Sequence, residues 1–397
     1  MLYKLLKIII RTALHIFCRR IYVHGRAQLA ADGPLLLAVN HPNSFLDAVI
    51  VAAYCRGPVY FLARGDAFHR PWARKMLTFL GCIPVYRLSE GRQYLHLNDQ
   101  SFDQCLAVLR RKGTVLIFSE GVCENEWKLR PLKKGTARLA LRAWQDPQIG
   151  SSLKVLPVGI NYDHFKAFGK HVFLNAGQFI LRSHMPEDAQ ERSFIALFNE
   201  RLKEQLASLC FHLEDRLQGS RHLRVAWVNA ARLLGVQENI FARLANKLHH
   251  PGFGQLPLPA LTNFEVAWDR QQGKIAYIRR TLYFIPACFG FVLNYPCWWT
   301  MRTIARIATR GSVFFDSAFF GLLLLGYPLY LLALAAVVYL VTGNALSWLL
   351  LLIAPLTGWL AIQFVANDRK CRNQKRMDGH ICREWLSFFQ QNEKFPG

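Results

Sequence analysis

The sequence predicts an α/β fold in which a central mixed sheet is flanked by helices, with an N-terminal amphipathic helix and C-terminal transmembrane helices. Three observations predict it. Between residue 26 and about residue 185, short apolar runs alternate with helical patterns, which is typical of a sheet covered by helices. Cations recur at helical spacing near the N-terminus. Two uncharged apolar stretches near the C-terminus are long enough to cross a bilayer.

The N-terminal segment, 1–25, carries cations that recur every three or four residues and therefore share one helical face: Lys4, Lys7, Arg11, His15 and Arg19. Apolar residues occupy a wide arc over the rest of the helix. This pattern predicts a helix that lies in a membrane interface with its basic face toward phosphates. An amphipathic helix docked on the protein core is the alternative.

The segment 26–215 contains the predicted sheet. Strands are expected at 35–39, 59–63, 114–118, 155–160 and 172–174, and helices at 45–54, 70–80, 100–111 and 135–144. In open α/β sheets, ligands bind beyond the carboxyl ends of the strands. His41 follows one of these ends and Glu120 follows another. We therefore expect both side chains in one cleft.

The last part of the chain is predicted to be helical and membrane-bound. Residues 216–311 are expected to form a helical extension, in which the apolar stretch 281–299 is interpreted as an interfacial or re-entrant segment. Within 312–397, the stretches 318–341 and 345–365 predict a transmembrane hairpin, followed by a basic cytoplasmic tail. Because cations flank the hairpin on both sides, both flanks are expected in the cytoplasm.

Composition narrows the choice of partner. Among 397 residues, Lys and Arg total 49 against 26 acids, which gives a formal charge of +23 and implies an anionic partner. Nucleic acid fits poorly, because no zinc-finger, helix-turn-helix or RNA-binding aromatic pattern is present. The ten cysteines are scattered without a C-x-x-C pair, which predicts reduced thiols rather than a zinc site or a disulfide framework.

The stretch LLLAVNHPNSFLDA, residues 35–48, holds a candidate catalytic pair. An imidazole can take a proton from an alcohol if a carboxylate fixes its tautomer and stabilises the charge that it gains. A separation of six residues does not bring His41 and Asp47 together on one helix. The pair works if His41 lies on the strand-to-helix turn and Asp47 comes from the following helix. A helix-capping histidine beside an unrelated acid is the alternative.

Further candidates come later in the chain. Arg87 ends an apolar run, and its guanidinium could bind a phosphate in bidentate fashion. Gly121 follows Glu120 at a strand end and could let an acceptor approach the backbone. Arg130, Lys133 and Lys134 precede a predicted helix and could form an anion site at its N-terminus. A solvated strand end and a solvated basic turn are the respective alternatives.

In their order and spacing, these stretches resemble the four blocks of the glycerolipid acyltransferase family, the glycerol-3-phosphate and 1-acylglycerol-3-phosphate acyltransferases. The matching residues are, block by block, Asn40-His41 with Asp47, then Gly81 with Arg87, then Phe118 with Glu120-Gly121, then Leu156-Pro157-Val158-Gly159. The resemblance covers residues 25 to 215, about half of the chain.

The resemblance implies a role for each matched residue. His41 would deprotonate the acceptor hydroxyl, and Asp47 would orient His41. Arg87 would hold the acceptor phosphate, together with the cations at 130–134, while Glu120 and Gly121 would shape the acceptor site. Pro157, in the fourth block, would lie near the acyl donor. An acyl-CoA or acyl carrier protein thioester is the expected donor, with no metal and no other cofactor. The expected surroundings are a phospholipid membrane, with the catalytic domain on its cytoplasmic face.

Two departures from the family pattern matter. Five residues separate His41 from Asp47 where the family has four, which resembles the fungal-type glycerol-3-phosphate acyltransferases and favours glycerol 3-phosphate or dihydroxyacetone phosphate as acceptor. The third block lacks its arginine, because Glu120-Gly121 is followed by Val122-Cys123-Glu124. The alternatives are an acyltransferase for another lysolipid and a non-catalytic lipid-binding or membrane-scaffolding protein.

Overall fold

The computed structural model describes residues 2–86, 91, 93, 96–162, 165, 166, 168–186, 190–210 and 273–374. The chain forms two compact units, one comprising Met1–Phe165 and His171–Glu214, the other Lys166–Lys170 and Asp215–Gly397. Two parts of the sequence predictions lie outside the described residues, namely the start of the helical extension and the basic tail beyond residue 374.

The first unit is built on a seven-stranded sheet with the order β1-β7-β6-β2-β5-β3-β4. Strands β2 to β6 run parallel where they pair, and β7 runs antiparallel to β6, so the sheet is mixed as predicted. The strands are β1 Cys18–His24, β2 Leu35–Val39, β3 Val59–Arg64, β4 Cys82–Val85, β5 Thr114–Phe118, β6 Lys154–Tyr162 and β7 Lys170–Ala176.

The central strand β2 sets the position of the site. All five of its residues are buried and apolar, as expected for a parallel strand covered on both faces. Val39, its last residue, pairs with Phe118 of β5 and with Val158 of β6. The carboxyl ends of β2 and β5 therefore lie level, and β6 continues past them to Tyr162. Residues that follow β2 and β5 must emerge at the same edge of the sheet.

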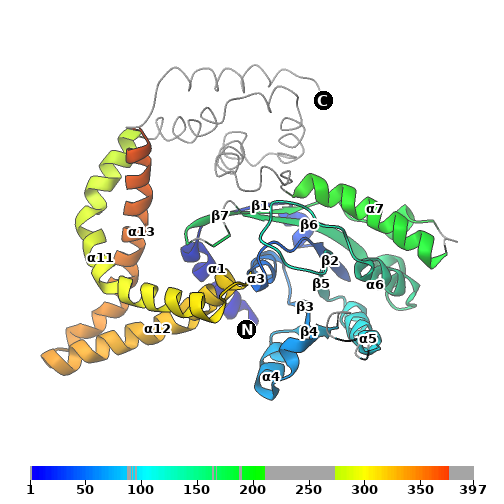
Figure 1. The fold of residues 1–397 in the computed structure, drawn as a ribbon, viewed down its shortest axis with the longest axis horizontal. Helices are drawn as coiled ribbons and strands as arrows, with labels where there is room; N and C mark the ends of the chain where they lie inside the picture. The colour runs from blue at the N-terminus through cyan, green and yellow to red at the C-terminus, as the bar shows by residue number, and fades with distance from the viewer. Residues whose placement is uncertain are drawn as a thin grey trace. The chain divides into compact units, whose positions relative to one another are not determined.

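Helices cover both faces of this sheet (Figure 1). The main core lies between the sheet and α5, α6 and α7, where Val115 and Ile117 meet residues such as Trp144 and Phe198. Helices α1 and α3 cover the other face. The helices of this unit are α1 Leu2–Phe17, α2 Arg26–Leu29, α3 Phe45–Tyr54, α4 Pro71–Phe79, α5 Leu97–Arg110, α6 Lys134–Gln145 and α7 Glu191–Leu209.

The N-terminal segment differs from its prediction in two ways. The helix ends at Phe17, and the residues that follow form the edge strand β1 rather than a further turn of helix. The cations Lys7 and Arg11 do not point outward. Lys7 donates to the carbonyl oxygen of Cys55, and Arg11 Nε donates to that of Ala53 at 2.6 Å, both at the carboxyl end of α3.

Part of the apolar surface of α1 is exposed, namely Leu5, Ile8, Ile9 and Ile16. Cations are well placed at the carboxyl end of α3, because the helix dipole is negative there. The docked face of α1 combines these two cations with the buried side chains of Leu14 and Phe17, while Lys4 and His15 are exposed. An interfacial position for α1 stays a prediction.

The second unit contains three long helices, α11 Gly273–Ala308, α12 Phe315–Thr342 and α13 Leu350–Gln374, with a short 3₁₀ turn, η7, at Ala345–Leu349. Within the part of the chain that the structure describes, Phe315–Thr342 and Ala345–Val365 are helical, long and apolar enough to cross a membrane. The predicted tight turn between them is present, and the Asn344 side chain accepts from the Leu346 amide at 2.9 Å.

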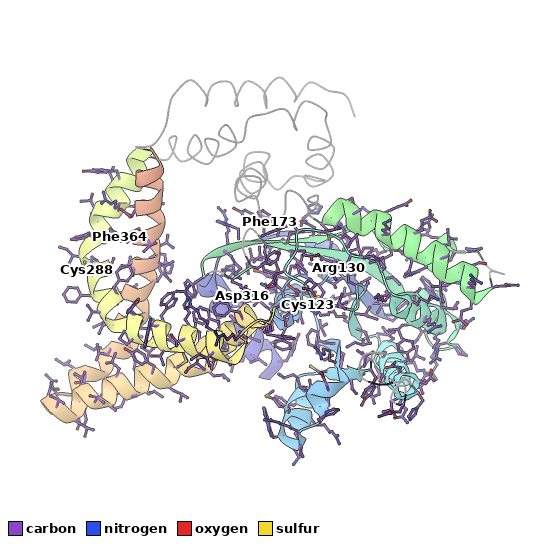
Figure 2. The ribbon with its side chains drawn as sticks, in the orientation of Figure 1. Cys123, Arg130, Phe173, Cys288, Asp316 and Phe364 are labelled. Carbon is purple, nitrogen blue, oxygen red and sulfur yellow. The ribbon has the colours of Figure 1, made fainter. Side chains whose placement is uncertain are left out.

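Helix α13 packs beside α11 (Figure 2, where Phe364 and Cys288 mark the two helices). Gly290 permits this approach, because a Cβ there would lie 2.1 Å from the Thr357 carbonyl oxygen. Asn294 Nδ2 donates to the Ala354 carbonyl at 2.9 Å. Residues 281–299, the expected interfacial or re-entrant segment, lie within one continuous helix, and their place relative to a membrane stays a prediction. Helix α13 packs more extensively on α11 than back along α12, its partner in the predicted hairpin.

Candidate active site

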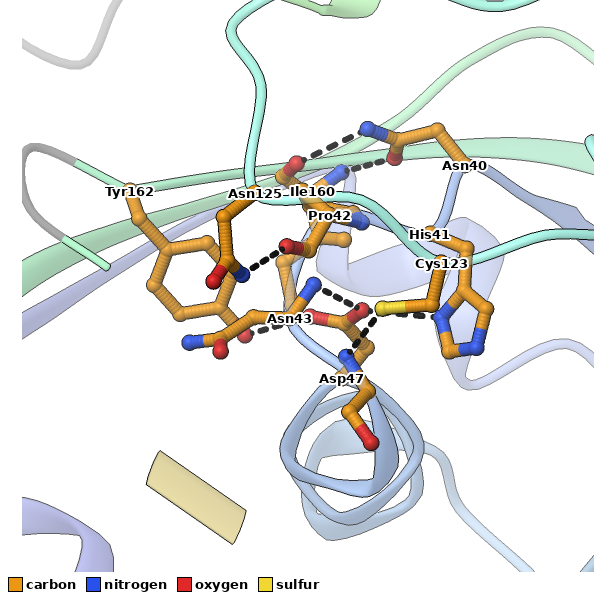
Figure 3. A network of polar contacts seen from close by, with 10 residues as sticks. Asn40, His41, Pro42, Asn43, Asp47, Cys123, Asn125, Ile160 and Tyr162 are labelled. Atoms are coloured by element: carbon orange, nitrogen blue, oxygen red, sulfur yellow. Dashed lines mark hydrogen bonds and ion pairs between the residues drawn. The ribbon is translucent and has the colours of Figure 1, made fainter. Parts of the chain in front are cut away.

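His41 and Asp47 meet as the turn-and-helix arrangement requires. β2 ends at Val39, His41 lies on the turn, and Asp47 lies in the first turn of α3. His41 Nδ1 is 3.0 Å from Asp47 Oδ2. The Asp47 side chain is fully buried, whereas 13% of the His41 side chain is exposed. A buried carboxylate thus backs an imidazole that reaches the surface of the unit (Figure 3).

The turn between His41 and Asp47 accommodates five intervening residues, one more than in the family pattern. Ser44 adopts φ 58° and ψ −143°, a region that non-glycine residues rarely occupy and that marks local strain. The strained turn directs the Asn43 amide back toward Asp47, and its N–H donates to Oδ2 at 2.7 Å. The Ser44 N–H donates to Cys123 Sγ at 2.9 Å. Asp47 therefore receives a backbone donor as well as the histidine.

Tyr162 completes the surroundings of Asp47. Its hydroxyl donates to Asp47 Oδ1 at 2.6 Å, across a separation of 115 residues. Trp127 Nε1 donates to the Tyr162 carbonyl at 2.6 Å and holds the end of β6 in place. Sequence reasoning missed Tyr162, although its place at the end of a strand beside the expected cleft was an available signal. Asp47 now accepts from three donors and leaves neither oxygen unpaired.

This pattern fixes the tautomer of His41. Asp47 accepts hydrogen bonds from the Asn43 amide and the Tyr162 hydroxyl, as a carboxylate does. Nδ1 of His41 therefore carries the proton and donates it to Asp47. Nε2 is then the basic nitrogen. The imidazole also stacks on Phe118, with ring centroids 3.6 Å apart and planes 12° apart. The ring is held from the side and from one face, as a general base requires.

Asn40 anchors the backbone just before the histidine. Its Nδ2 donates to the Ile160 carbonyl at 3.0 Å, and its Oδ1 accepts from the Ile160 amide at 2.7 Å. The Asn40 side chain thus makes one donor and one acceptor bond to the backbone of β6, as a further residue of β2 would. On the other side, Asn125 Nδ2 donates to the Pro42 carbonyl at 2.8 Å. The turn carrying His41 is therefore fixed at both ends.

Glu120 lies beneath the site rather than at its opening, and only 3% of it is exposed. Burial raises the pKa of its carboxyl to about 8, and the charge of Asp47 contributes in the same direction. Backbone N–H groups of Arg130 and His41 donate to the carboxyl and oppose this rise in pKa. The role of Glu120 in shaping the acceptor site stays a prediction. Its carboxyl holds two backbone segments together.

The backbone at Gly121 requires glycine. Its φ is +68°, and a Cβ there would lie 2.8 Å from Cγ of Lys133. Its role in letting an acceptor approach the backbone stays a prediction. Cys123 stays a poor nucleophile, because burial raises the pKa of its thiol and the charge of Asp47 adds to that rise.

Of the three cations expected to form an anion site, Arg130, Lys133 and Lys134, one already has an acidic partner. Both guanidinium contacts of Arg130 to Glu126 measure 3.1 Å, so this cation is already paired. Lys133 and Lys134 are exposed at the start of α6. Pro157 is buried in β6 opposite Ala38, so the structure does not bring it to the opening. Arg87, the predicted phosphate ligand, lies outside the described residues.

A small pocket adjoins the His41 turn on the side of β6. Its lining includes Trp127, Lys128, Tyr162 and Phe165. Among the described residues, no group of three or more His, Cys, Asp or Glu side chains could hold a metal ion.

Part of the chain is similar to a known protein family. Residues 6–161 match the model of the Acyltransferase family, and this range contains His41, Asp47 and Glu120. The match covers less than half of the chain. The crystal structure of the 1-acyl-sn-glycerophosphate (LPA) acyltransferase PlsC from Thermotoga maritima is similar at 18% identity and a TM-score of 0.35, covering 49% of this chain and 75% of the other. No curated protein matches the sequence.

Proposed function

We propose that the chain transfers a fatty acyl group from an acyl thioester to a hydroxyl of glycerol 3-phosphate or 1-acylglycerol 3-phosphate. The observation that supports this proposal is the His41–Asp47 pair. Its Nδ1–Oδ2 distance is 3.0 Å, and the carboxylate is fully buried behind the ring. The match of residues 6–161 to the Acyltransferase family model supports the reaction class.

The proposed reaction needs only the groups at this site and its two substrates. Nε2 of His41 removes the proton of the acceptor hydroxyl as the hydroxyl oxygen attacks the thioester carbonyl carbon. Asp47 stabilises the imidazolium that forms, because its oxygens are already oriented by Asn43 and Tyr162. Collapse of the tetrahedral intermediate breaks the carbon–sulfur bond, and the departing thiolate takes the proton from His41. The products are an ester and a free thiol.

The substrates would be held by charge. Lys133 and Lys134 are exposed cations beside the loop that carries Glu120, and Arg87 is the proposed bidentate ligand of the acceptor phosphate. The donor would be acyl-CoA or acyl carrier protein. The apolar helices of the second unit would keep the chain in a phospholipid membrane, with the site on the cytoplasmic face.

An acyl-transfer assay on the full chain in nanodiscs tests this proposal. Labelled acyl-CoA, or an acyl carrier protein thioester, is supplied with glycerol 3-phosphate and separately with 1-acylglycerol 3-phosphate. Transfer to one of them identifies the acceptor, and loss of that transfer in Arg87→Ala supports phosphate recognition. Transfer only to a phosphate-free lysolipid, unaffected by Arg87→Ala, would overturn the choice of acceptor. No transfer by a folded chain to any acceptor would favour a non-catalytic lipid-binding role.

A further inference from the structure

Helix α4 presents its apolar side chains away from the sheet that it connects. It joins β3 to β4, two parallel neighbours, and such crossover helices normally bury an apolar stripe on the sheet. In α4 only Ala73 is buried. Trp72 is 62% exposed, Met76 47% and Phe79 76%. The large side chains that a crossover helix would use for packing are thus left uncovered.

The exposed side chains form one stripe. Positions 72, 76 and 79 have the spacing i, i+4 and i+7, which places them on the same face of a helix. Leu80, directly after the helix, is 37% exposed and extends the stripe. Single exposed apolar side chains are common, but a stripe that contains both Trp and Phe marks an interaction surface.

The charges around this stripe are positive. Arg70, Arg74 and Lys75 are exposed on or next to α4. Asp66, an acid in the preceding 3₁₀ turn, forms an ion pair with Arg64. An apolar stripe bordered by cations matches the boundary between acyl chains and anionic headgroups. Self-association fits less well, because a two-fold contact would bring like charges of two copies together.

We propose that α4 is an interfacial membrane helix of the first unit, with Trp72, Met76 and Phe79 inserted among the lipids. Arg70, Arg74 and Lys75 would contact the phosphates of anionic lipids. This anchor is separate from the apolar helices of the second unit and from the exposed apolar side chains of α1. It would hold the β3–β4 edge of the sheet, from which the chain continues toward Arg87, against the bilayer.

Tryptophan quenching by brominated lipids tests the proposal on the full chain. Nanodiscs contain phosphatidylcholine and phosphatidylglycerol, with bromines placed either near the headgroup or deep in the acyl chain. Emission of the wild type minus that of Trp72→Phe gives the signal of Trp72. The matched control is Trp144→Phe, which removes a core indole whose Nε1 donates to the Leu153 carbonyl at 3.3 Å.

The proposal predicts that the Trp72 signal loses emission to shallow bromines, and less to deep ones, while the Trp144 signal loses none. The loss should decrease in Phe79→Lys, and when phosphatidylglycerol is omitted or salt is raised. Thermal unfolding shows that the variants are folded. A Trp72 signal that is unquenched in every nanodisc would overturn the proposal. If Met76→Cys also formed disulfide-linked dimers, a second copy of the chain would be the occupant instead.

Discussion

The three donors to Asp47 are the most informative feature at the scale of single residues. A carboxylate removed from water is stable only when its oxygens are hydrogen-bonded. Here the Tyr162 hydroxyl satisfies Oδ1 at 2.6 Å, while the Asn43 amide and His41 share Oδ2. Tyr162 therefore acts on the imidazole through Asp47, as a positioning residue.

Tyr162→Phe should lower kcat for acyl transfer about tenfold and leave KM nearly unchanged. A hydrogen bond to a charged group contributes about 1.5–3 kcal/mol, and its loss weakens the support of the imidazolium. Steady-state kinetics against pH measures the effect, with a shifted pH profile expected as well. Tyr60→Phe is the matched control, because the Tyr60 ring is exposed on β3. Equal kcat values for Tyr162→Phe and the wild type would show that Tyr162 is not a positioning residue.

The Glu120 carboxyl predicts an unusual dependence of stability on pH. Its pKa is raised from 4.5 to about 8 in the folded chain, chiefly by burial. Between these values the folded chain holds a proton that the unfolded chain releases. The stabilisation is thus complete below pH 4.5 and is lost as the pH rises through 8.

The neutral variant Glu120→Gln lacks this titration. From pH 5 to pH 8 the wild type should lose stability relative to Glu120→Gln by about 3 kcal/mol. The Tm of both chains in nanodiscs, followed by tryptophan emission, measures the difference. Parallel Tm curves for the two chains across this pH range would contradict the assignment.

The sequence predicted local geometry better than long-range partners. The meeting of His41 and Asp47 followed from a strand, a turn and a helix within seven residues. The bonds from Tyr162 to Asp47 and from Asn40 to Ile160 span 115 and 120 residues. No local pattern encodes such pairs, because they depend on the order of the strands in the sheet.

At the scale of elements, buried parallel strands were the easiest to predict. The strands 35–39 and 114–118 agree with the structure, since their apolar runs are bounded by polar turns. The edge strand β1 was missed. Its alternation of buried Ile21 and Val23 with more exposed neighbours has a period of two, but Arg19 also fits the helical spacing of the preceding cations.

Helix α7 supplies a test of element packing. A Cβ at Gly159 of β6 would lie 2.4 Å from the Leu209 carbonyl oxygen at the end of α7. That oxygen also accepts from Asn161 Nδ2 at 2.9 Å and from Asn175 Nδ2 at 3.0 Å. The end of α7 is therefore held in place at the point where it would have to shift to make room for a Cβ at residue 159.

Gly159→Ala should destabilise the folded chain by about 1–3 kcal/mol, as overpacking does in a close-packed interior. The matched control is Gly57→Ala, because a Cβ at Gly57 meets nothing within 4 Å. Thermal unfolding of both variants in nanodiscs compares them. A Tm for Gly159→Ala as high as that of the control would show that α7 can shift without cost.

At the scale of the whole molecule, apolar surface and positive charge occur together. The chain carries a formal charge of +23. Phe315–Thr342 and Ala345–Val365 are helical and apolar enough to span a bilayer. Charge alone would give binding that salt reverses, whereas burial of such helices in lipid would not be reversed by salt.

Membranes from cells that express the chain should therefore retain it through washes with high salt and with alkaline carbonate. Detergent should release it. Immunoblots of pellets and supernatants after centrifugation measure the distribution. A chain released by salt or carbonate alone would contradict membrane-spanning helices and leave only peripheral attachment.

The central claim is that His41 is the base of an acyl transfer. The most direct test compares the rate of ester formation by the wild type, His41→Ala and the matched control His69→Ala, whose histidine is exposed just before α4. We expect His41→Ala to lose nearly all transfer and His69→Ala to keep the wild-type rate. Undiminished transfer by a folded His41→Ala chain would contradict this claim.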